Sequence, residues 1–322
     1  MFAGKTIFIA PLDWGLGHAT RCIPLISELV KNNQVILGLT PLTADLLQSE
    51  FPRLEKVNLP PYNIQYSATF PIWLKLLMDW MRISKIIRAE HRFLNKIIPE
   101  KKIDVVISDN RFGLYSEKAH CIVLTHQVFL RSPIFSEFAQ RMNKKFLLRF
   151  QELWIPDHAE IKNSLSGPLS HGVHFHPNYR FIGPLSRLHT MESASEYDYA
   201  LLISGPQPQQ SIFRELCLRL ASSHPNKRFV MISPDSFNNS LPNLQVSVLP
   251  TTEELSRHLC ASIGIVCRSG YSSLMDVHAL RKKKMLLVPT PGQTEQEYLA
   301  KYWQEHFGAR VCLQKDLGAF DL

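Results

Sequence analysis

Short, nearly all-apolar runs recur along this chain and alternate with longer segments in which apolar residues return every three or four positions. Runs without polar alternation predict strands that are buried on both faces of a parallel sheet, and the longer period predicts helices that cover them. The sequence therefore predicts an α/β fold. The predicted strands are residues 5–10, 34–39, 103–108, 121–126, 152–156, 199–204, 228–233, 244–249, 262–267 and 284–289.

A break between two such series divides the chain. Gly183, Pro184 and a polar cluster precede the strand at 199–204, so we place a linker at about 184–196. A length of 322 residues is more than one core ordinarily supports. We expect two Rossmann-like parallel-sheet domains that face a cleft, one at 1–185 and one at 196–322, with ligands at the carboxyl ends of the strands. The predicted helices are 18–31, a short helix from Pro41, 70–98, 134–149, 208–222, 251–260, 270–279 and 293–306.

Composition narrows the class of protein. Hydrophobic residues make up 45% of the chain and charged residues 20%, which is typical of a soluble globular protein. No apolar stretch is long enough to span a bilayer, and the N-terminus lacks the layout of a signal peptide, so we expect a cytoplasmic protein. The six cysteines are scattered without a C-x-x-C pair, which indicates reduced core residues and no metal site.

The net charge of +8 suits an anionic partner, such as phosphate or an acidic membrane surface. No basic stripe is interleaved with aromatic residues, so we expect no nucleic acid. Residues 70–102 hold eight Lys or Arg and three Asp or Glu, within a pattern rich in Trp, Leu and Ile. A basic amphipathic helix of this kind either lies on an anionic membrane or packs its apolar stripe on the core.

The segment "DWGLGHATR", residues 13–21, joins the first strand to the first helix. Gly15 and Gly17 let the backbone approach a ligand, and a helix N-terminus attracts anions. The segment lacks the third glycine of a dinucleotide fingerprint and the Lys-Ser/Thr of a phosphate loop. It offers instead an imidazole, His18, at the start of the helix, where the alternative is an ordinary turn beside a solvated histidine.

Two other strand ends in the first half hold polar or ionisable residues that could take part in catalysis. Asp109 follows the strand at 103–108. His126 ends the strand at 121–126, and Gln127 follows it. If the strands are parallel, these residues share an edge with His18. A carboxylate such as Asp13 or Asp109 would hold the imidazole tautomer and stabilise its protonated form. A turn or a helix cap is the competing interpretation for each of them.

The second half repeats the arrangement. Ser204 and Gly205 lie at the end of one strand, and "VCRSGYSSLMDV" ends another strand at Arg268 and opens a helix. Backbone N–H groups at Ser269 and Gly270, with the hydroxyl of Ser272, would bind a diphosphate. The remaining predicted polar groups of this half are Asp276, two turns along the same helix, and Gln296 and Glu297, which begin the next one.

These residues resemble the C-terminal donor domain of glycosyltransferase family 28, the MurG-type enzymes of the GT-B fold. The likeness is good over residues 262–302 and looser over both domains. It implies that Ser269, Gly270 and Ser272 face the diphosphate of a UDP-sugar and that Asp276, where the family usually has Glu, binds the ribose. It also implies sugar contacts for Gln296 and Glu297. We expect Ser204, Gly205 and Arg268 to contact a bound nucleotide-sugar donor. The "GLGH" loop resembles the glycine-rich loop of the family, in which the matching His is the proposed base, and "THQ" is similar to a stretch of its acceptor domain.

The departures from the family leave alternatives open. "GLGHATR" is also similar to the G-x-G-H-x-x-R loop of the nucleotide-sugar hydrolase of pseudaminic acid synthesis, which has the same fold and uses water. The chain ends soon after "ARVCLQKD", so the sequence leaves open whether the terminal helix that crosses back in this fold is present.

We expect an inverting transferase with His18 as base and a hydroxyl acceptor, either lipid-linked or part of a cell-envelope glycan. No D-x-D motif occurs, so we expect no metal and no cofactor apart from the donor. The alternatives are the hydrolase and a non-catalytic nucleotide-sugar binding protein.

Overall fold

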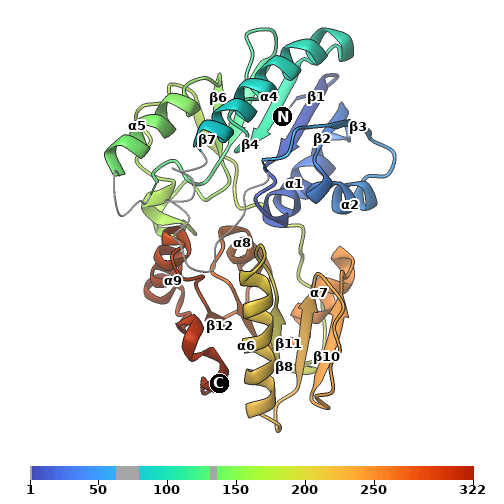
Figure 1. Ribbon diagram of the computed structural model, residues 1–322, viewed down its shortest axis with the longest axis vertical. Coiled ribbons are helices and arrows are strands. Elements are labelled where there is room, and N and C mark those ends of the chain that lie inside the picture. The colour runs from blue at the N-terminus through green and yellow to red at the C-terminus, as the bar shows by residue number, and fades with distance from the viewer. Residues whose placement is uncertain (1, 63–79, 131–135) are drawn as a thin grey trace. The chain divides into compact units, whose positions relative to one another are not determined.

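A computed structural model describes residues 2–62, 80–130 and 136–322 (Figure 1). The chain forms two compact units. The described residues up to Leu185 make the first unit, and Ser186–Leu322 belong to the second. None of the helices in the described ranges has the length and the apolar character that a membrane span requires.

The first unit is built on a seven-stranded sheet with the order β3-β2-β1-β4-β5-β6-β7. Every pair of neighbouring strands is parallel, which confirms the predicted fold class. The sheet strands are β1 (Thr6–Pro11), β2 (Gln34–Leu39), β3 (Glu55–Asn58), β4 (Val105–Asp109), β5 (His120–Leu124), β6 (Glu152–Ile155) and β7 (Tyr179–Phe181). The helices are α1 (Leu16–Leu29), α2 (Pro41–Glu50), α4 (Trp80–Lys101), α5 (Ser136–Leu147), η1 (Ile161–Asn163) and η2 (Gly167–Leu169).

Both faces of this sheet are covered. Ile7 and Ile9 of β1 pack in one cluster with apolar residues of α1 and α2. Phe8, between them, points to the opposite face and packs with apolar residues of α4. The alternation follows from the two-residue period of a strand, and it explains why the sequence of β1 is apolar throughout.

Helix α4 decides one of the alternatives left open by the sequence. Its buried residues include Ile83, Ile87, Leu94 and Ile97, which recur at helical spacing and face the core of the unit. In the described part of the segment, the apolar stripe is therefore a core-packing face. Residues 70–79 of the predicted helix, and residues 134–135 of the next one, lie outside the described residues.

The second unit has a six-stranded parallel sheet with the order β10-β9-β8-β11-β12-β13. Apolar residues of α6, among them Phe213 and Leu220, pack with Leu317 of η3 on one face. Its strands are β8 (Tyr197–Leu202), β9 (Phe229–Ser233), β10 (Leu244–Val248), β11 (Ser262–Cys267), β12 (Lys284–Leu287) and β13 (Arg310–Val311). Its helices are α6 (Gln209–Ser223), α7 (Thr252–Cys260), α8 (Tyr271–Ala279), α9 (Thr294–Phe307) and η3 (Gln314–Ala319).

Three strands were not expected from the sequence. They are β3, β7 and β13, which hold four, three and two residues and lie at sheet edges. Edge strands are buried on fewer sides and tolerate polar residues, so they lack the apolar runs on which the prediction depends. The ten predicted strands are all present, with ends shifted by up to a few residues.

Candidate functional site

The first candidate site lies at the carboxyl ends of β1, β4 and β5. Gly15 is the N-cap of α1 and has a φ of 143°, in a region that side-chain-bearing residues rarely adopt. This turn starts α1 at Leu16, so His18 lies in the first turn of the helix. Arg21 follows three residues later and therefore lies on the same face of α1.

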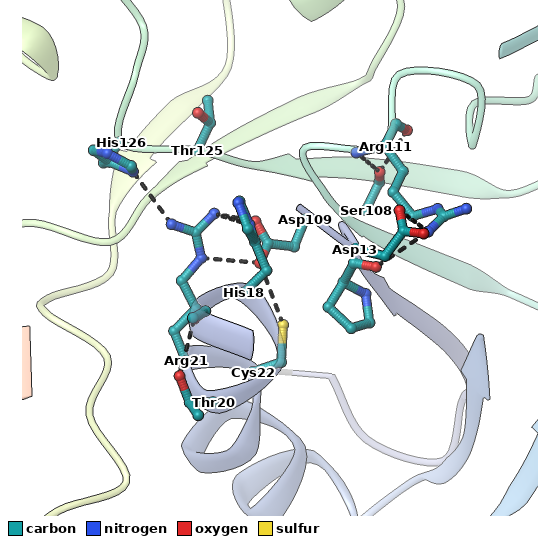
Figure 2. Close-up of polar contacts among 12 residues, drawn as sticks. Asp13, His18, Thr20, Arg21, Cys22, Ser108, Asp109, Arg111, Thr125 and His126 are labelled. Atoms are coloured by element: carbon teal, nitrogen blue, oxygen red, sulfur yellow. Dashed lines mark hydrogen bonds and ion pairs between the residues drawn. The ribbon is translucent and has the colours of Figure 1, made fainter. Parts of the chain in front are cut away.

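Asp109 is the centre of the site (Figure 2). It is the last residue of β4 and lies beside the end of β1, and its side chain is fully buried. His18 Nδ1 lies 3.1 Å from Asp109 Oδ2. The Arg21 guanidinium donates from Nε to Oδ2 over 2.9 Å and from Nη2 to Oδ1, so the pair is bidentate. Cys22 Sγ lies 3.6 Å from Oδ2.

Burial and ion pairing set the protonation of these groups. Burial alone would raise the pKa of Asp109, but Arg21 and His18 outweigh it and hold that pKa well below its usual range. Burial lowers the pKa of His18, and Arg21 lowers it further against the opposing effect of Asp109. At neutral pH the site therefore holds an ionised carboxylate beside a neutral imidazole.

A neutral imidazole of this kind is able to act as a base. When Nδ1 carries the proton and donates it to Asp109, Nε2 presents a lone pair. His18 is about one-fifth exposed, so this ring is reachable while its partner Asp109 is not. The arrangement is the geometry of a general base held by a buried carboxylate.

The structure brings together some of the predicted residues of the first unit and separates others. His126 is buried, and its Nδ1 lies 3.2 Å from Arg21 Nη1. Gln127 lies next to it and is partly buried, and its backbone carbonyl accepts a hydrogen bond from Asn143. Of the two carboxylates considered as partners for His18, the structure selects Asp109.

Asp13 belongs to a second buried group. Its carboxylate accepts from the Tyr62 backbone amide over 3.0 Å and from Arg111 Nη1 at 3.5 Å. Arg111 also donates from Nε to Glu90 over 2.6 Å, and Tyr62 Oη donates to the same carboxylate over 2.8 Å. Asp13 thus anchors the loop after β1, and neither of these contacts involves His18.

Arg21 belongs to the cluster around Asp109, and the sequence alone gave it no role. Its signal was its spacing from His18, because residues i and i+3 share one face of a helix. The sequence shows an Arg at this position but not what it binds. That depends on β4, whose end lies beside β1 only in the folded sheet.

The second candidate site lies at the carboxyl ends of β8, β11 and β12. Helices α6, α8 and α9 each begin a few residues after one of these neighbouring strands. The first backbone N–H groups of a helix have no intrahelical acceptor, and they attract anions. Gly205, with a φ of 100°, and Gly270, the N-cap of α8, have no atom within 4 Å of the place where a Cβ would stand. Ser204 is partly buried beside Gly205, and Ser272 is partly buried in the first turn of α8.

Hydrogen bonds tie the start of α8 to the start of α9. Ser269 is buried, and its hydroxyl donates to the backbone carbonyl of Gln296 over 2.8 Å. The side chain of Gln296 accepts from the Thr290 amide over 3.0 Å, and Glu297 accepts from the Gly292 amide over 3.0 Å. Gln296 and Glu297 therefore shape the loop between β12 and α9, and their predicted sugar contacts remain predictions.

Asp276 lies on α8, where it was expected. Ser186 donates to its carboxylate over 2.5 Å. Burial raises the pKa of Asp276 to about 6, against the lowering effects of Ser186 and Arg187. A carboxyl group with this pKa changes its charge in the range in which an enzyme works.

Arg268 requires a correction. Its side chain is 2% exposed and donates to the backbone carbonyls of Val288 and Gln209 and to the side chain of Gln314. The guanidinium also lies over the Phe213 ring. It holds the ends of β11 and β12 to α6 and η3, so the expected donor contact of this side chain is wrong.

Within residues 2–62, 80–130 and 136–322, no group of three or more His, Cys, Asp or Glu side chains is arranged to hold a metal ion.

The comparisons with known proteins agree with this architecture. Residues 213–322 match the family model of the glycosyltransferase family 28 C-terminal domain. MurG of Acinetobacter baumannii has a similar structure, with a TM-score of 0.54 and 12% identity over 97% of this chain and 86% of that one. The kitacinnamycin glycosyltransferase gives a TM-score of 0.64 and 16% identity over 98% and 87% of the two chains. UGT89C1 of Arabidopsis thaliana, in complex with UDP-L-rhamnose, gives a TM-score of 0.64 and 13% identity over 99% of this chain and 89% of that one. No curated protein sequence matches the chain.

The two parallel-sheet units and these structural neighbours define a GT-B fold. The resemblance stated from the sequence is confirmed over residues 213–322, which match the glycosyltransferase family 28 C-terminal domain, and the fold of the chain is similar to that of MurG.

Proposed function

We propose that this protein transfers a sugar from a UDP-sugar to a hydroxyl group, with inversion at the anomeric carbon and without a metal ion. The observation that carries the proposal is the pairing of His18 with the buried, ionised Asp109 at one sheet edge. The acceptor hydroxyl loses its proton to His18 Nε2 as its oxygen attacks the anomeric carbon. The bond from that carbon to the diphosphate breaks, and the nucleoside diphosphate leaves.

The second unit supplies what the leaving group needs. The leaving diphosphate gathers negative charge, and the N-terminus of α8 at Gly270 offers backbone N–H donors and the positive end of a helix dipole. Donors fixed in advance stabilise this charge more in the transition state than in the ground state. The solved complex of UGT89C1 with UDP-L-rhamnose supports a UDP-sugar as the donor. Gly15, Gly17, Ser204, Gly205 and Ser272 are the other proposed donor contacts.

A lipid-linked acceptor is the acceptor class that the surface of the first unit supports. Trp80 at the start of α4 lies 6.1 Å from Phe146 of α5, ring to ring, so these helices adjoin. On the same two helices, Met81 of α4 and Phe138 of α5 are 77% and 63% exposed. Exposed apolar residues among basic ones suit an anionic membrane surface. The exposed basic residues of the two helices include Arg82, Lys85, Arg141, Lys144 and Lys145.

Hydrolysis of the nucleotide-sugar is the second candidate function. The observation that favours it is the G-x-G-H-x-x-R loop, in which His18 and Arg21 are both bound to Asp109. Water then takes the place of the acceptor hydroxyl, and His18 removes a proton from water. The two reactions share the base and the leaving group and differ only in the acceptor.

Nucleotide release from a panel of UDP-, GDP- and dTDP-sugars, without acceptor, tests these proposals. Tight binding of one donor with little release is the expected result for a transferase. Many turnovers that disappear in His18→Ala indicate the hydrolase. Many turnovers that persist unchanged in His18→Ala would contradict both. His174→Ala is the matched control, because His174 is exposed. Co-sedimentation with anionic vesicles tests the lipid surface, and binding that is independent of anionic lipid and of salt would contradict it.

A further inference from the structure

The guanidinium of Arg21 contacts three different groups. It forms the bidentate ion pair with Asp109, and its Nη1 lies 3.2 Å from His126 Nδ1. Its Nη2 lies 2.9 Å from His18 Nδ1. One buried arginine therefore contacts the carboxylate and both imidazoles of the site (Figure 2).

The contacts at His18 Nδ1 exclude each other. Asp109 Oδ2, at 3.1 Å, only accepts a hydrogen bond from this atom, whereas Arg21 Nη2, at 2.9 Å, only donates one to it. If Nδ1 carries the proton, it donates to Asp109, and Nε2 has a free lone pair. If Nδ1 is bare, it accepts from Arg21, and the proton lies on Nε2. Only the first tautomer is a base at Nε2.

The contact at His126 has one solution. An arginine only donates, so the bond from Nη1 requires a lone pair on His126 Nδ1. The neutral ring then carries its proton on Nε2 and is a hydrogen-bond donor at that atom. Arg21 therefore requires an unprotonated Nδ1 in His126, whereas at His18 it competes with Asp109 for Nδ1.

We propose that Arg21 is a positioning residue that sets the tautomer and the basicity of His18 by competing with Asp109 for its Nδ1, while it holds Asp109 in place. This role deepens the proposed function and rests on it, because it concerns His18 as the base. Arg21 keeps the imidazole neutral and restricts the fraction of His18 that has a free lone pair on Nε2.

The charges around His18 agree with this role. The ionisable groups that face it are Asp109 of β4, Arg21 and Cys22 of its own helix, and His126 after β5. After burial, Asp109 raises the pKa of His18, and Arg21 and His126 lower it. Removal of the Arg21 charge therefore takes away one of the effects that oppose Asp109 at this ring, and burial and His126 remain.

The experiment is nitrogen-15 NMR of histidine-labelled protein, with His18 assigned by its absence in His18→Ala. Long-range proton–nitrogen correlations report the tautomer and the pKa of the ring without any substrate. In Arg21→Gln, which keeps a donor for Asp109, we expect the Nδ1–H tautomer to increase. The pKa of His18 should rise by about one unit or more. In the control Arg53→Gln both should stay at their wild-type values, because Arg53 is exposed.

A folded Arg21→Gln with the wild-type tautomer and pKa would overturn the proposal. If this variant does not fold, Arg21→Lys replaces it: the charge is kept, so the pKa of His18 should stay close to its wild-type value. The tautomer should still move toward Nδ1–H, since the fixed contact with Nδ1 is lost. An unchanged tautomer in this variant would equally overturn the proposal.

Turnover separates this inference from the proposed function. The base must be neutral, so the acid limb of the kcat/KM profile should move up in pH together with the pKa of His18 in Arg21→Gln. If wild type turns over its substrate and His18→Ala leaves that turnover unchanged, the proposed function fails while the NMR result stands. If the pKa moves but the acid limb does not, Arg21 tunes His18 without controlling the base, which overturns the positioning role.

Discussion

The two sheet edges that carry candidate sites have the same architecture and opposite chemistry. At the edge of the first unit, ionisable side chains dominate, with Asp109 and Arg21 buried and paired and His18 beside them. At the edge of the second unit, the groups on offer are mainly the backbone N–H groups of α6, α8 and α9, and the guanidinium of Arg268 points into the protein. A parallel sheet thus positions residues at its carboxyl edge without dictating what they do.

The difference predicts which edge responds to pH. Buried ionisable groups couple strongly, because the surrounding medium screens them poorly, so one proton changes the whole cluster around Asp109. Backbone N–H groups do not titrate, and a helix N-terminus attracts an anion over a wide pH range. Asp276 is the exception in the second unit, because burial gives it a pKa of about 6.

Substitution of His18 should have the largest effect. We expect His18→Gln to lower turnover by about 10²–10⁴-fold, the usual range for a lost general base, and to leave nucleotide affinity nearly unchanged. Gln keeps a polar side chain but accepts no proton. The measurement is kcat with the best donor of the panel, with nucleotide affinity from calorimetry. An equal loss of affinity and turnover would place His18 among the binding groups and would remove the contrast between the edges.

Asp109 should give the largest effect on stability. Asp109→Asn leaves the Arg21 guanidinium buried without its carboxylate, which costs about 3–5 kcal/mol when a buried ion pair is broken. The folded-state pKa of Asp109 lies below its unfolded value, so its contribution is present above about pH 4 and is lost as the pH falls. Denaturation of both proteins at a series of pH values measures this. The difference between them should shrink below pH 4, and a constant difference would show that Asp109 is not an ionised partner of Arg21.

Sequence patterns sufficed where burial fixes the residue type. The apolar runs located the central strands, and strand ends with polar residues located His18, Asp109 and Gly270, since parallel strands bring their carboxyl ends to one edge. The patterns did not predict which side chains form hydrogen bonds with one another. The sequence offered Asp13 and Asp109 equally, and only the folded sheet brings Asp109 to His18 and directs Asp13 to Arg111. The predicted donor contact of Arg268 was wrong. An arginine at a strand end suggests a ligand contact, and the sequence does not show that this side chain is buried.

Gly270 and Gly15 should separate binding from folding. An alanine methyl at Gly270 meets no atom within 4 Å, and its φ of −71° is ordinary, so Gly270→Ala should fold normally. A diphosphate close to this backbone would meet the methyl group, so nucleotide affinity should fall about tenfold, or about 1.4 kcal/mol. Gly15→Ala should instead destabilise the protein by about 1–3 kcal/mol, because its φ of 143° is strained for alanine. Thermal melts and nucleotide titrations of both variants check this, and unchanged affinity in Gly270→Ala would exclude a close phosphate.

Substitution of Asp276 should give the smallest effect on nucleotide affinity. Asp276 is also the residue through which the sheet edge of the second unit would respond to pH. Its raised pKa means that the folded protein binds this proton more tightly than the unfolded chain does. The proton's contribution to stability is therefore present below about pH 4 and is lost as the pH rises through about 6.

The family resemblance implies that Asp276 binds the ribose, and an ionised carboxylate there would accept hydrogen bonds from both hydroxyls. Nucleotide affinity should then increase a few-fold, or about 1 kcal/mol, as the pH rises through this range. UDP with a 2′,3′-dideoxyribose removes the hydroxyls and should bind without this dependence, and Asp276→Asn should bind UDP without it as well. A pH dependence that survives in Asp276→Asn would arise from the phosphate or from another group. The carboxyl group would then be one that binds Ser186 and takes no part in recognition of the ribose.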